Sequence, residues 1–203
     1  MNNLRIFLDL DGVLADFVGG ACRIHGWTRE RFAAKHPPGS WFMQSTLQVS
    51  NTKFWRHIDE AGVDFWLGLQ PTPWARELVR LVEQYTKDWY VLSAPSKHVS
   101  SYVGKLGWIR RFFGDDFDRL LLTSHKHLLA TPQSLLIDDR EKTTEAFVAS
   151  GGHAIIFPSL HNCFHPYAAD PVPYVSRALK EITSMPTQPK QKRKHETRRS
   201  VDV

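Results

Sequence analysis

Short apolar runs along the chain alternate with stretches of helical periodicity. Apolar residues recur at helical spacing over 72–85, 100–113 and 140–150. The apolar runs that separate these stretches are uniform rather than alternating, which is typical of strands buried on both faces of a parallel sheet. They cover 4–8, 89–93, 119–123, 134–137 and 153–157. This alternation predicts an α/β fold with a doubly wound parallel sheet.

The interval after the first strand departs from this alternation. Residues 17–70 are rich in aromatic side chains and contain no clear strand. We expect a small helical cap over 17–70, inserted into a core made of 1–16 and 71–185. Such an insert would lie over the carboxyl ends of the strands, where open α/β sheets bind ligands.

Composition narrows the class of protein. The chain has 203 residues, of which 42% are hydrophobic, enough for one domain with a real core. Two cysteines exclude a disulfide scaffold and fit a reducing compartment. The apolar start of the chain is interrupted by Asp9, Asp11 and Asp16, which a signal peptide would not tolerate. We therefore expect a cytoplasmic protein with no membrane partner.

Positive charge is concentrated at the end of the chain. The net charge is +5, and residues 186–203 carry six basic and two acidic side chains, so the rest is nearly neutral. This segment has almost no apolar residues and is predicted to be disordered. A solvated tail, a weak contact with nucleic acid and an artefact of expression all remain open.

Two carboxylates follow the first predicted strand directly. Side chains alternate along a strand, so Asp9 and Asp11 leave its end on the same side, and Gly12 allows a sharp turn there. Such a pair is costly unless a cation lies between them, and oxygen ligands suit Mg²⁺. The pattern indicates a nucleophilic aspartate beside one that serves as acid and base. The alternative is a pair of loop carboxylates that cap a helix.

A second acidic pair follows another predicted strand. Asp138 and Asp139 come directly after the apolar run 134–137. Taken alone, they could cap the next helix. Together with the first pair, they indicate one metal site at the carboxyl edge of the sheet.

These motifs resemble those of a known superfamily. DxDGVxxD followed far downstream by an apolar run and DD is the signature of the haloacid-dehalogenase-like phosphohydrolases. The likeness is closer to the 5′(3′)-deoxyribonucleotidases over residues 4–165. It rests on DLDGVLADF, VLSAPSK, GKLGWIRRFFGDDF, LLLTSHK, LLIDDR and His161-Asn162, in that order. The resemblance implies a Rossmann-like core with a parallel sheet and a small helical cap inserted after the first strand.

The resemblance also implies a mechanism. Asp9 would attack phosphorus to form an aspartyl-phosphate, while Asp11 would protonate the leaving oxygen and later activate water. Mg²⁺ would be held by Asp9, the backbone carbonyl of Asp11 and Asp139, with Asp138 binding directly or through water. Two further residues would act on the phosphate, Ser93 through a hydrogen bond and Lys105 through its charge. A plain strand-end hydroxyl and a surface lysine are the alternatives for these two.

Aromatic residues of the insert fit a nucleotide substrate, because bases stack on aromatic faces. Phe17 matches a substrate-contacting phenylalanine of the family, and Trp41, Phe42 and Trp55 fall near aromatics of the family's cap. Ordinary core packing is the alternative for each. Lys126 stands where the family also has lysine and is counted with the substrate-binding residues, with an exposed lysine as the alternative.

The sequence therefore predicts a Mg²⁺-dependent phosphatase that hydrolyses (deoxy)ribonucleoside monophosphates to nucleoside and phosphate. Family members often dimerise, which suggests a homodimer. Ala94 replaces a family serine, which puts discrimination of sugar or base in doubt. The rival functions are a related phosphatase acting on another phosphate ester or a nucleic-acid end, and a non-catalytic phosphate-binding protein.

Overall fold

A computed structural model describes residues 4–184. The predicted tail over 186–203 lies outside the described residues. Among those residues, no helix is both long and apolar enough to cross a membrane.

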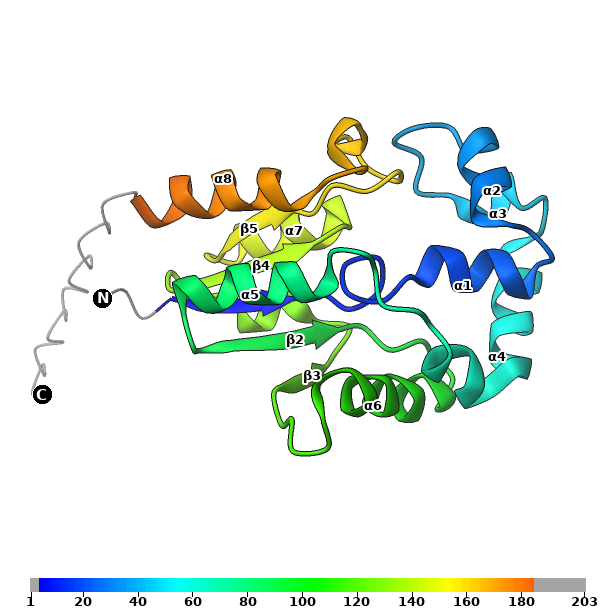
Figure 1. Ribbon diagram of the computed structural model, residues 1–203, viewed down its shortest axis with the longest axis horizontal. Helices are drawn as coiled ribbons and strands as arrows, with labels where there is room; N and C mark the ends of the chain where they lie inside the picture. The colour runs from blue at the N-terminus through cyan, green and yellow to red at the C-terminus, as the bar shows by residue number, and fades with distance from the viewer. Residues whose placement is uncertain (1–3, 185–203) are drawn as a thin grey trace, which may run out of the picture.

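The centre of the molecule is a five-stranded parallel sheet, shown in Figure 1. The strand order is β3-β2-β1-β4-β5, and every neighbouring pair is parallel. The strands are β1 (Arg5–Leu8), β2 (Trp89–Ser93), β3 (Leu120–Leu122), β4 (Ser134–Asp138) and β5 (His153–Ile156). The five strands predicted from uniform apolar runs are confirmed to within a residue at either end. The α/β class is confirmed as well.

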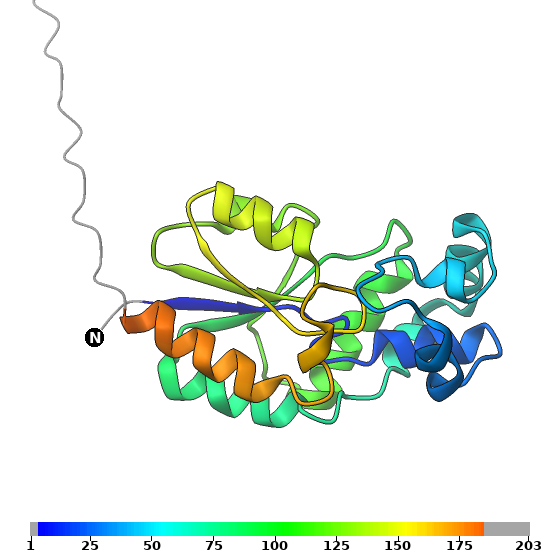
Figure 2. The same cartoon turned by 90° about the horizontal axis from the view of Figure 1, so that it is seen from above.

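Helices cover both faces of this sheet, as Figure 2 shows from above. On one face, α5 (Ala75–Tyr85), α6 (Ser100–Phe113) and α8 (Val172–Ser184) share a large apolar cluster with the sheet. On the other face, α7 (Glu141–Ala149) and the 3₁₀ turn η1 (Lys126–Leu129) pack over a smaller cluster around Phe7 and Phe147. The helices α5, α6 and α7 confirm the periodic stretches of the sequence.

Helix α8 has no counterpart among the predicted elements. Its buried residues Val172, Val175 and Leu179 follow helical spacing, so the signal was present in the sequence. A second 3₁₀ turn, η2 (His165–Tyr167), precedes it. Helix α8 packs against α5 and β5 and closes that face of the core.

The interval between β1 and α5 is helical, and Figure 1 shows it beyond the carboxyl ends of the strands. It contains α1 (Phe17–Ile24), α2 (Arg29–Lys35), α3 (Met43–Thr46) and α4 (Asn51–Leu67), the last kinked at Gly62. Helix α4 packs on α6, where a Cβ at Gly104 would overlap Trp66. The division into a core and a cap with the boundaries given above remains a prediction.

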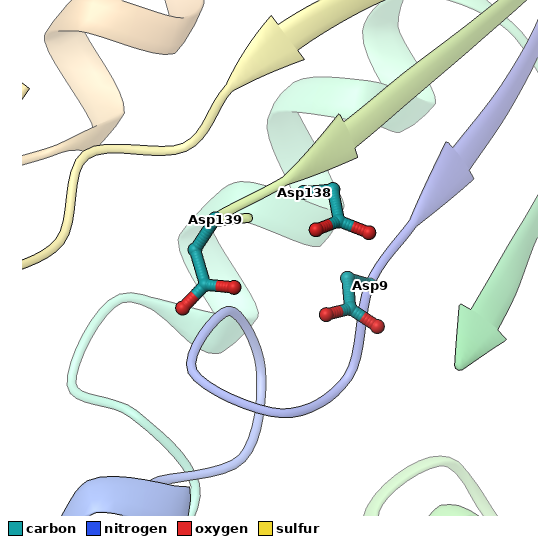
Figure 3. A group of neighbouring side chains, drawn as sticks. All are labelled: Asp9, Asp138 and Asp139. Atoms are coloured by element: carbon teal, nitrogen blue, oxygen red, sulfur yellow. The ribbon is translucent and has the colours of Figure 1, made fainter. Parts of the chain in front are cut away.

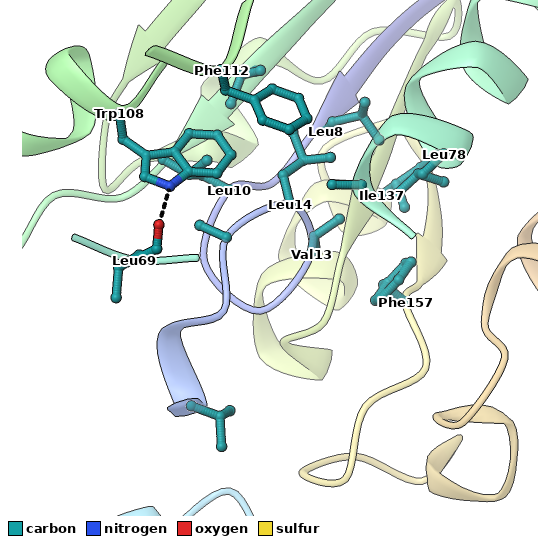
Figure 4. Close-up of a cluster of buried hydrophobic side chains, with 14 of the residues drawn as sticks. Leu8, Leu10, Val13, Leu14, Leu69, Leu78, Trp108, Phe112, Ile137 and Phe157 are labelled. Atoms are coloured by element: carbon teal, nitrogen blue, oxygen red, sulfur yellow. Dashed lines mark hydrogen bonds between the residues drawn. The ribbon is translucent and has the colours of Figure 1, made fainter. Parts of the chain in front are cut away.

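The loop that follows β1 is held rigidly. Leu10, Val13 and Leu14 are buried among side chains of α5, α6 and the sheet, as Figure 4 shows. The carbonyl of Val13 accepts hydrogen bonds from Thr72 Oγ1 at 2.8 Å and from Trp74 Nε1 at 2.9 Å. Because this loop carries apolar side chains into the core, the polar residues between them have fixed positions.

Candidate active site

The two acidic motifs meet because their strands are neighbours. Leu8 pairs with Ile137, and the backbone N–H of Asp9 donates to the Ile137 carbonyl at 2.9 Å. Asp9 therefore follows β1 beside Asp138 at the end of β4. The chain reverses its direction of winding between these two strands, and such a switch point opens the crevice in which doubly wound sheets bind ligands.

Three carboxylates converge at this edge of the sheet (Figure 3). Asp9, Asp138 and Asp139 each offer an oxygen within 4.8 Å of the others, and all three residues are buried. Burial and the neighbouring carboxylates raise the pKa of Asp138 to about 6 and that of Asp139 well above its usual value. The folded chain thus holds negative charge in a place that disfavours it, which a bound cation would relieve.

Lys126 is part of this acidic cluster. Its Nζ donates to Asp9 Oδ1 at 2.6 Å and to Asp138 Oδ2 at 2.7 Å. Its side chain is only 4% exposed, so the alternative of an exposed lysine is wrong. Although burial alone would lower the pKa of Lys126, the two carboxylates raise it, and the side chain is charged. With three carboxylates ionised, this ammonium leaves two negative charges, which one divalent cation balances.

The turn after Asp11 requires glycine. Gly12 has a φ of +80°, a conformation that L side chains rarely adopt. A Cβ at this position would also overlap the carboxylate of Asp139. Gly12 therefore allows the loop after β1 to pass close to the Asp139 carboxylate.

A second cluster surrounds Lys105, which extends from α6. Its Nζ donates to the Asp11 carboxylate, to Ser93 Oγ at 2.7 Å and to the Ala94 carbonyl at 2.9 Å. Lys105 is 1% exposed, so it is not the surface lysine of the alternative. The Asp11 side chain therefore lies with Lys105, outside the group formed by Asp9 and the β4 carboxylates. Burial raises the pKa of Asp11, against the opposing effect of Lys105.

A cavity of about 1220 Å³ opens in front of these clusters. Its wall includes Asp9, Asp11, Lys126, Asp138 and Asp139. From the helical interval between β1 and α5 it includes the predicted aromatic residues Phe17, Trp41 and Trp55. Phe42 is 61% exposed and lies outside the cavity wall. Ser93 is fully buried and does not line the cavity. Phe17 also packs edge-to-face on Phe65, with ring centroids 5.8 Å apart, so it serves both the core and the cavity.

Some residues in or behind the cavity wall were not assigned a role from the sequence. Arg140 follows the β4 carboxylates and places its guanidinium 5.4 Å from the ring centre of Trp41. Asn162 Nδ2 donates to the carbonyls of Asp139 and Phe157, each at 2.8 Å, and so holds the backbone behind the acidic cluster. In the sequence, these residues appeared only as members of the motif series, in LLIDDR and in the His161-Asn162 pair.

Comparisons with known proteins identify the family of the chain. A family model described as "5' nucleotidase, deoxy (Pyrimidine), cytosolic type C protein" matches residues 2–170. The chain belongs to this family. It is a 5′(3′)-deoxyribonucleotidase-like phosphoric monoester hydrolase with the haloacid-dehalogenase-like fold.

Two curated relatives of this nucleotidase illustrate the likeness. The mitochondrial 5′(3′)-deoxyribonucleotidase of Mus musculus is 31% identical over 179 residues, which cover 78% of this chain and 74% of the relative. The cytosolic-type enzyme of Homo sapiens is 26% identical over 173 residues, covering 79% and 82%.

Solved structures show the same fold at low identity. A predicted phosphatase from Clostridium acetobutylicum has a TM-score of 0.55 at 14% identity, covering 88% of this chain and 98% of its own. A hydrolase from Streptococcus pneumoniae has a TM-score of 0.51 at 15% identity, covering 89% and 100%.

Proposed function

We propose that this nucleotidase is a Mg²⁺-dependent phosphatase that converts nucleoside monophosphates, deoxyribonucleotides foremost, to nucleoside and phosphate through an aspartyl-phosphate. The observation that carries the proposal is the position of Asp9. Its carboxylate lines the cavity, accepts from the buried Lys126 and lies beside two further carboxylates, in a cavity that aromatic residues also line.

The residues present fit a magnesium ion. Asp9, Asp138 and Asp139 supply hard oxygen ligands, and the backbone carbonyl of Asp11 would complete the set. Bound there, Mg²⁺ would supply positive charge beside the oxygens of the phosphoryl group. The excess of negative charge around Lys126 supports a divalent rather than a monovalent ion.

The first chemical step belongs to Asp9. One of its oxygens, Oδ1, accepts from Lys126, and the other oxygen is left free of that bond for the attack. That oxygen forms a bond to phosphorus as the bond from phosphorus to the nucleoside oxygen breaks. Lys126 and Lys105 supply positive charge on two sides of the phosphate, as phosphoryl transfer requires.

Asp11 moves the protons. Burial raises its pKa, so its carboxyl holds a proton more readily than an exposed aspartate and donates it to the departing nucleoside oxygen. The resulting carboxylate then takes a proton from a water molecule, whose oxygen attacks phosphorus and frees Asp9. Lys105 lies against Asp11 and steadies it in its charged state.

The cavity wall supports a nucleoside as the leaving group. Trp41 and Trp55 present flat aromatic surfaces of the kind on which bases stack. The cytoplasmic location remains a prediction, since the relatives include both cytosolic and mitochondrial types. The homodimer and the nucleic-acid contact of the tail also remain predictions.

The proposal is tested by phosphate release from deoxyribonucleoside, ribonucleoside and sugar phosphates, with Mg²⁺ and with EDTA. We expect turnover to be strongest on deoxyribonucleotides, to disappear with EDTA and to fall roughly a thousandfold or more in Asp9→Asn. Asp88→Asn is the matched control, because Asp88 pairs with the exposed Arg5 away from the cavity wall. Equal weak turnover of every ester would refute the nucleotidase, and near-normal activity of Asp9→Asn would refute the nucleophile.

A further inference from the structure

His161 lies where the loop after β5 meets the segment between α2 and α3. Its Nδ1 is 3.0 Å from His36 Nε2 and 3.3 Å from the Ser40 carbonyl. The neighbouring backbone adds a bond from the Gly39 N–H to the Leu160 carbonyl at 2.9 Å. The ring is therefore held from the side of its Nδ1.

The other nitrogen of the ring is unused. Nε2 of His161 is buried and has no hydrogen-bond partner within residues 4–184, although the residue is only 6% exposed. His161 lines the cavity beside Trp41, with the two ring centroids 6.1 Å apart. A buried polar atom without a partner is costly, so one at a cavity wall points to a ligand.

The surrounding bonds occupy Nδ1 of His161 and leave Nε2 as its unused nitrogen. The Ser40 carbonyl accepts from His36 Nε2 at 2.7 Å, and His36 Nδ1 lies 2.8 Å from Thr46 Oγ1. His161 Nδ1 lies against this group, 3.0 Å from His36 Nε2 and 3.3 Å from the same carbonyl. Burial lowers the pKa of His161 to about 4, so the ring is neutral near pH 7 and Nε2 can make one hydrogen bond.

We infer that His161 positions the substrate through a hydrogen bond between Nε2 and a polar group on its nucleoside part. The inference rests on the proposed function. Lys105 and Lys126 already serve the phosphate end, whereas His161 stands beside the aromatic wall that faces the nucleoside. It is a positioning residue that favours nucleotides over simple phosphate esters.

Two substitutions of His161 distinguish the roles of its two ring nitrogens. The amide of asparagine lies near the place of Nδ1, and the amide of glutamine reaches the place of Nε2. The measurement is kcat and KM for thymidine 5′-monophosphate and for phenyl phosphate, which has no nucleoside. We expect His161→Asn to lower the preference for the nucleotide about tenfold, mainly through KM. We expect His161→Gln to keep that preference within about threefold of the wild type.

His25→Asn is the matched control. His25 also has a buried Nε2 without a partner among residues 4–184, but it stacks on Phe54 and His57 and lies outside the cavity wall. Its preference should stay within about twofold of the wild type, since no substrate contact is removed. The ratio of two substrates in one preparation is independent of any unfolded fraction.

Each contrary result overturns the inference. If His161→Gln loses the preference and His161→Asn keeps it, the residue acts through Nδ1 by docking two segments. If both variants keep the preference or both lose it equally, Nε2 makes no specific contact. A wild-type enzyme that does not prefer the nucleotide refutes the proposed function itself, before any variant is measured.

Discussion

The two walls of the cavity are built differently. On the sheet side, Asp9, Asp138 and Lys126 are buried and joined by ion pairs of 2.6 and 2.7 Å. On the side of the helical interval, the wall residue Trp41 is 42% exposed, on a short segment between α2 and α3. The groups proposed to act on phosphate are thus buried at the sheet edge, whereas the tryptophan proposed to face the leaving group lies on a more exposed segment. Such a division lets the choice of substrate change while the chemistry is kept.

The largest expected effect is the loss of stability on removing a buried charge from the sheet side of the cavity. Lys126→Met leaves Asp9 and Asp138 without their cation, and removing one partner of a buried ion pair costs about 3–5 kcal/mol. We expect the Tm of the metal-free protein to fall by about 10 °C, measured by calorimetry. Lys105→Met is the matched variant and should cost roughly half as much, because Asp11 keeps more contact with solvent than Asp9. Equal losses in the two variants would contradict this account of the cluster.

The acidic edge was predictable because it depends on local rules. Residues that follow a buried strand must leave at its carboxyl end, and two such strands side by side bring Asp9 and Asp138 together. The role of Lys126 was not predictable in this way. Nothing in a polar loop indicates that η1 turns the side chain into the sheet edge, since this depends on the packing of η1 over Phe147.

The cap side was predicted less well, for a related reason. Helical character over 17–70 follows from composition, but the direction of each aromatic depends on contacts between distant segments. Trp41 turns toward the cavity beside His161 and Arg140, while the adjacent Phe42 turns outward. These partners lie in the second half of the chain, so sequence spacing could not distinguish the two aromatics.

Binding of magnesium to the acidic cluster should be measurable as a rise in the Tm of the protein. A ligand at one hundred times its Kd stabilises the folded state by about 2.7 kcal/mol, so Mg²⁺ should raise the Tm by about 5–10 °C. Asp139→Asn should lose most of this shift. Asp11→Asn should keep it, because the Asp11 carboxylate lies with Lys105 and is not one of the three that converge. An unchanged shift in Asp139→Asn would show that magnesium acts elsewhere.

The Tm, with and without Mg²⁺, should depend on pH in a defined way. The pKa of Asp138 is raised to about 6 in the folded chain, so its protonated form is favoured by folding. Its contribution to stability is present below the unfolded pKa near 3.8 and is lost as the pH rises through about 6. The metal-free protein should therefore lose stability over this window, and the Mg²⁺-induced shift should grow over it, because metal binding displaces the proton.

The smallest expected effect distinguishes the two adjacent aromatics of the cap. Trp41→Ala should raise the KM for a deoxyribonucleoside monophosphate about tenfold, the size expected for one stacked base, with kcat within about threefold. Phe42→Ala is the matched control and should leave both constants within about twofold, because its ring lies outside the cavity wall. Steady-state kinetics at saturating Mg²⁺ would decide. Because both residues sit on one segment, a shared loss would mean that the segment, and not the indole ring facing the cavity, governs nucleotide binding.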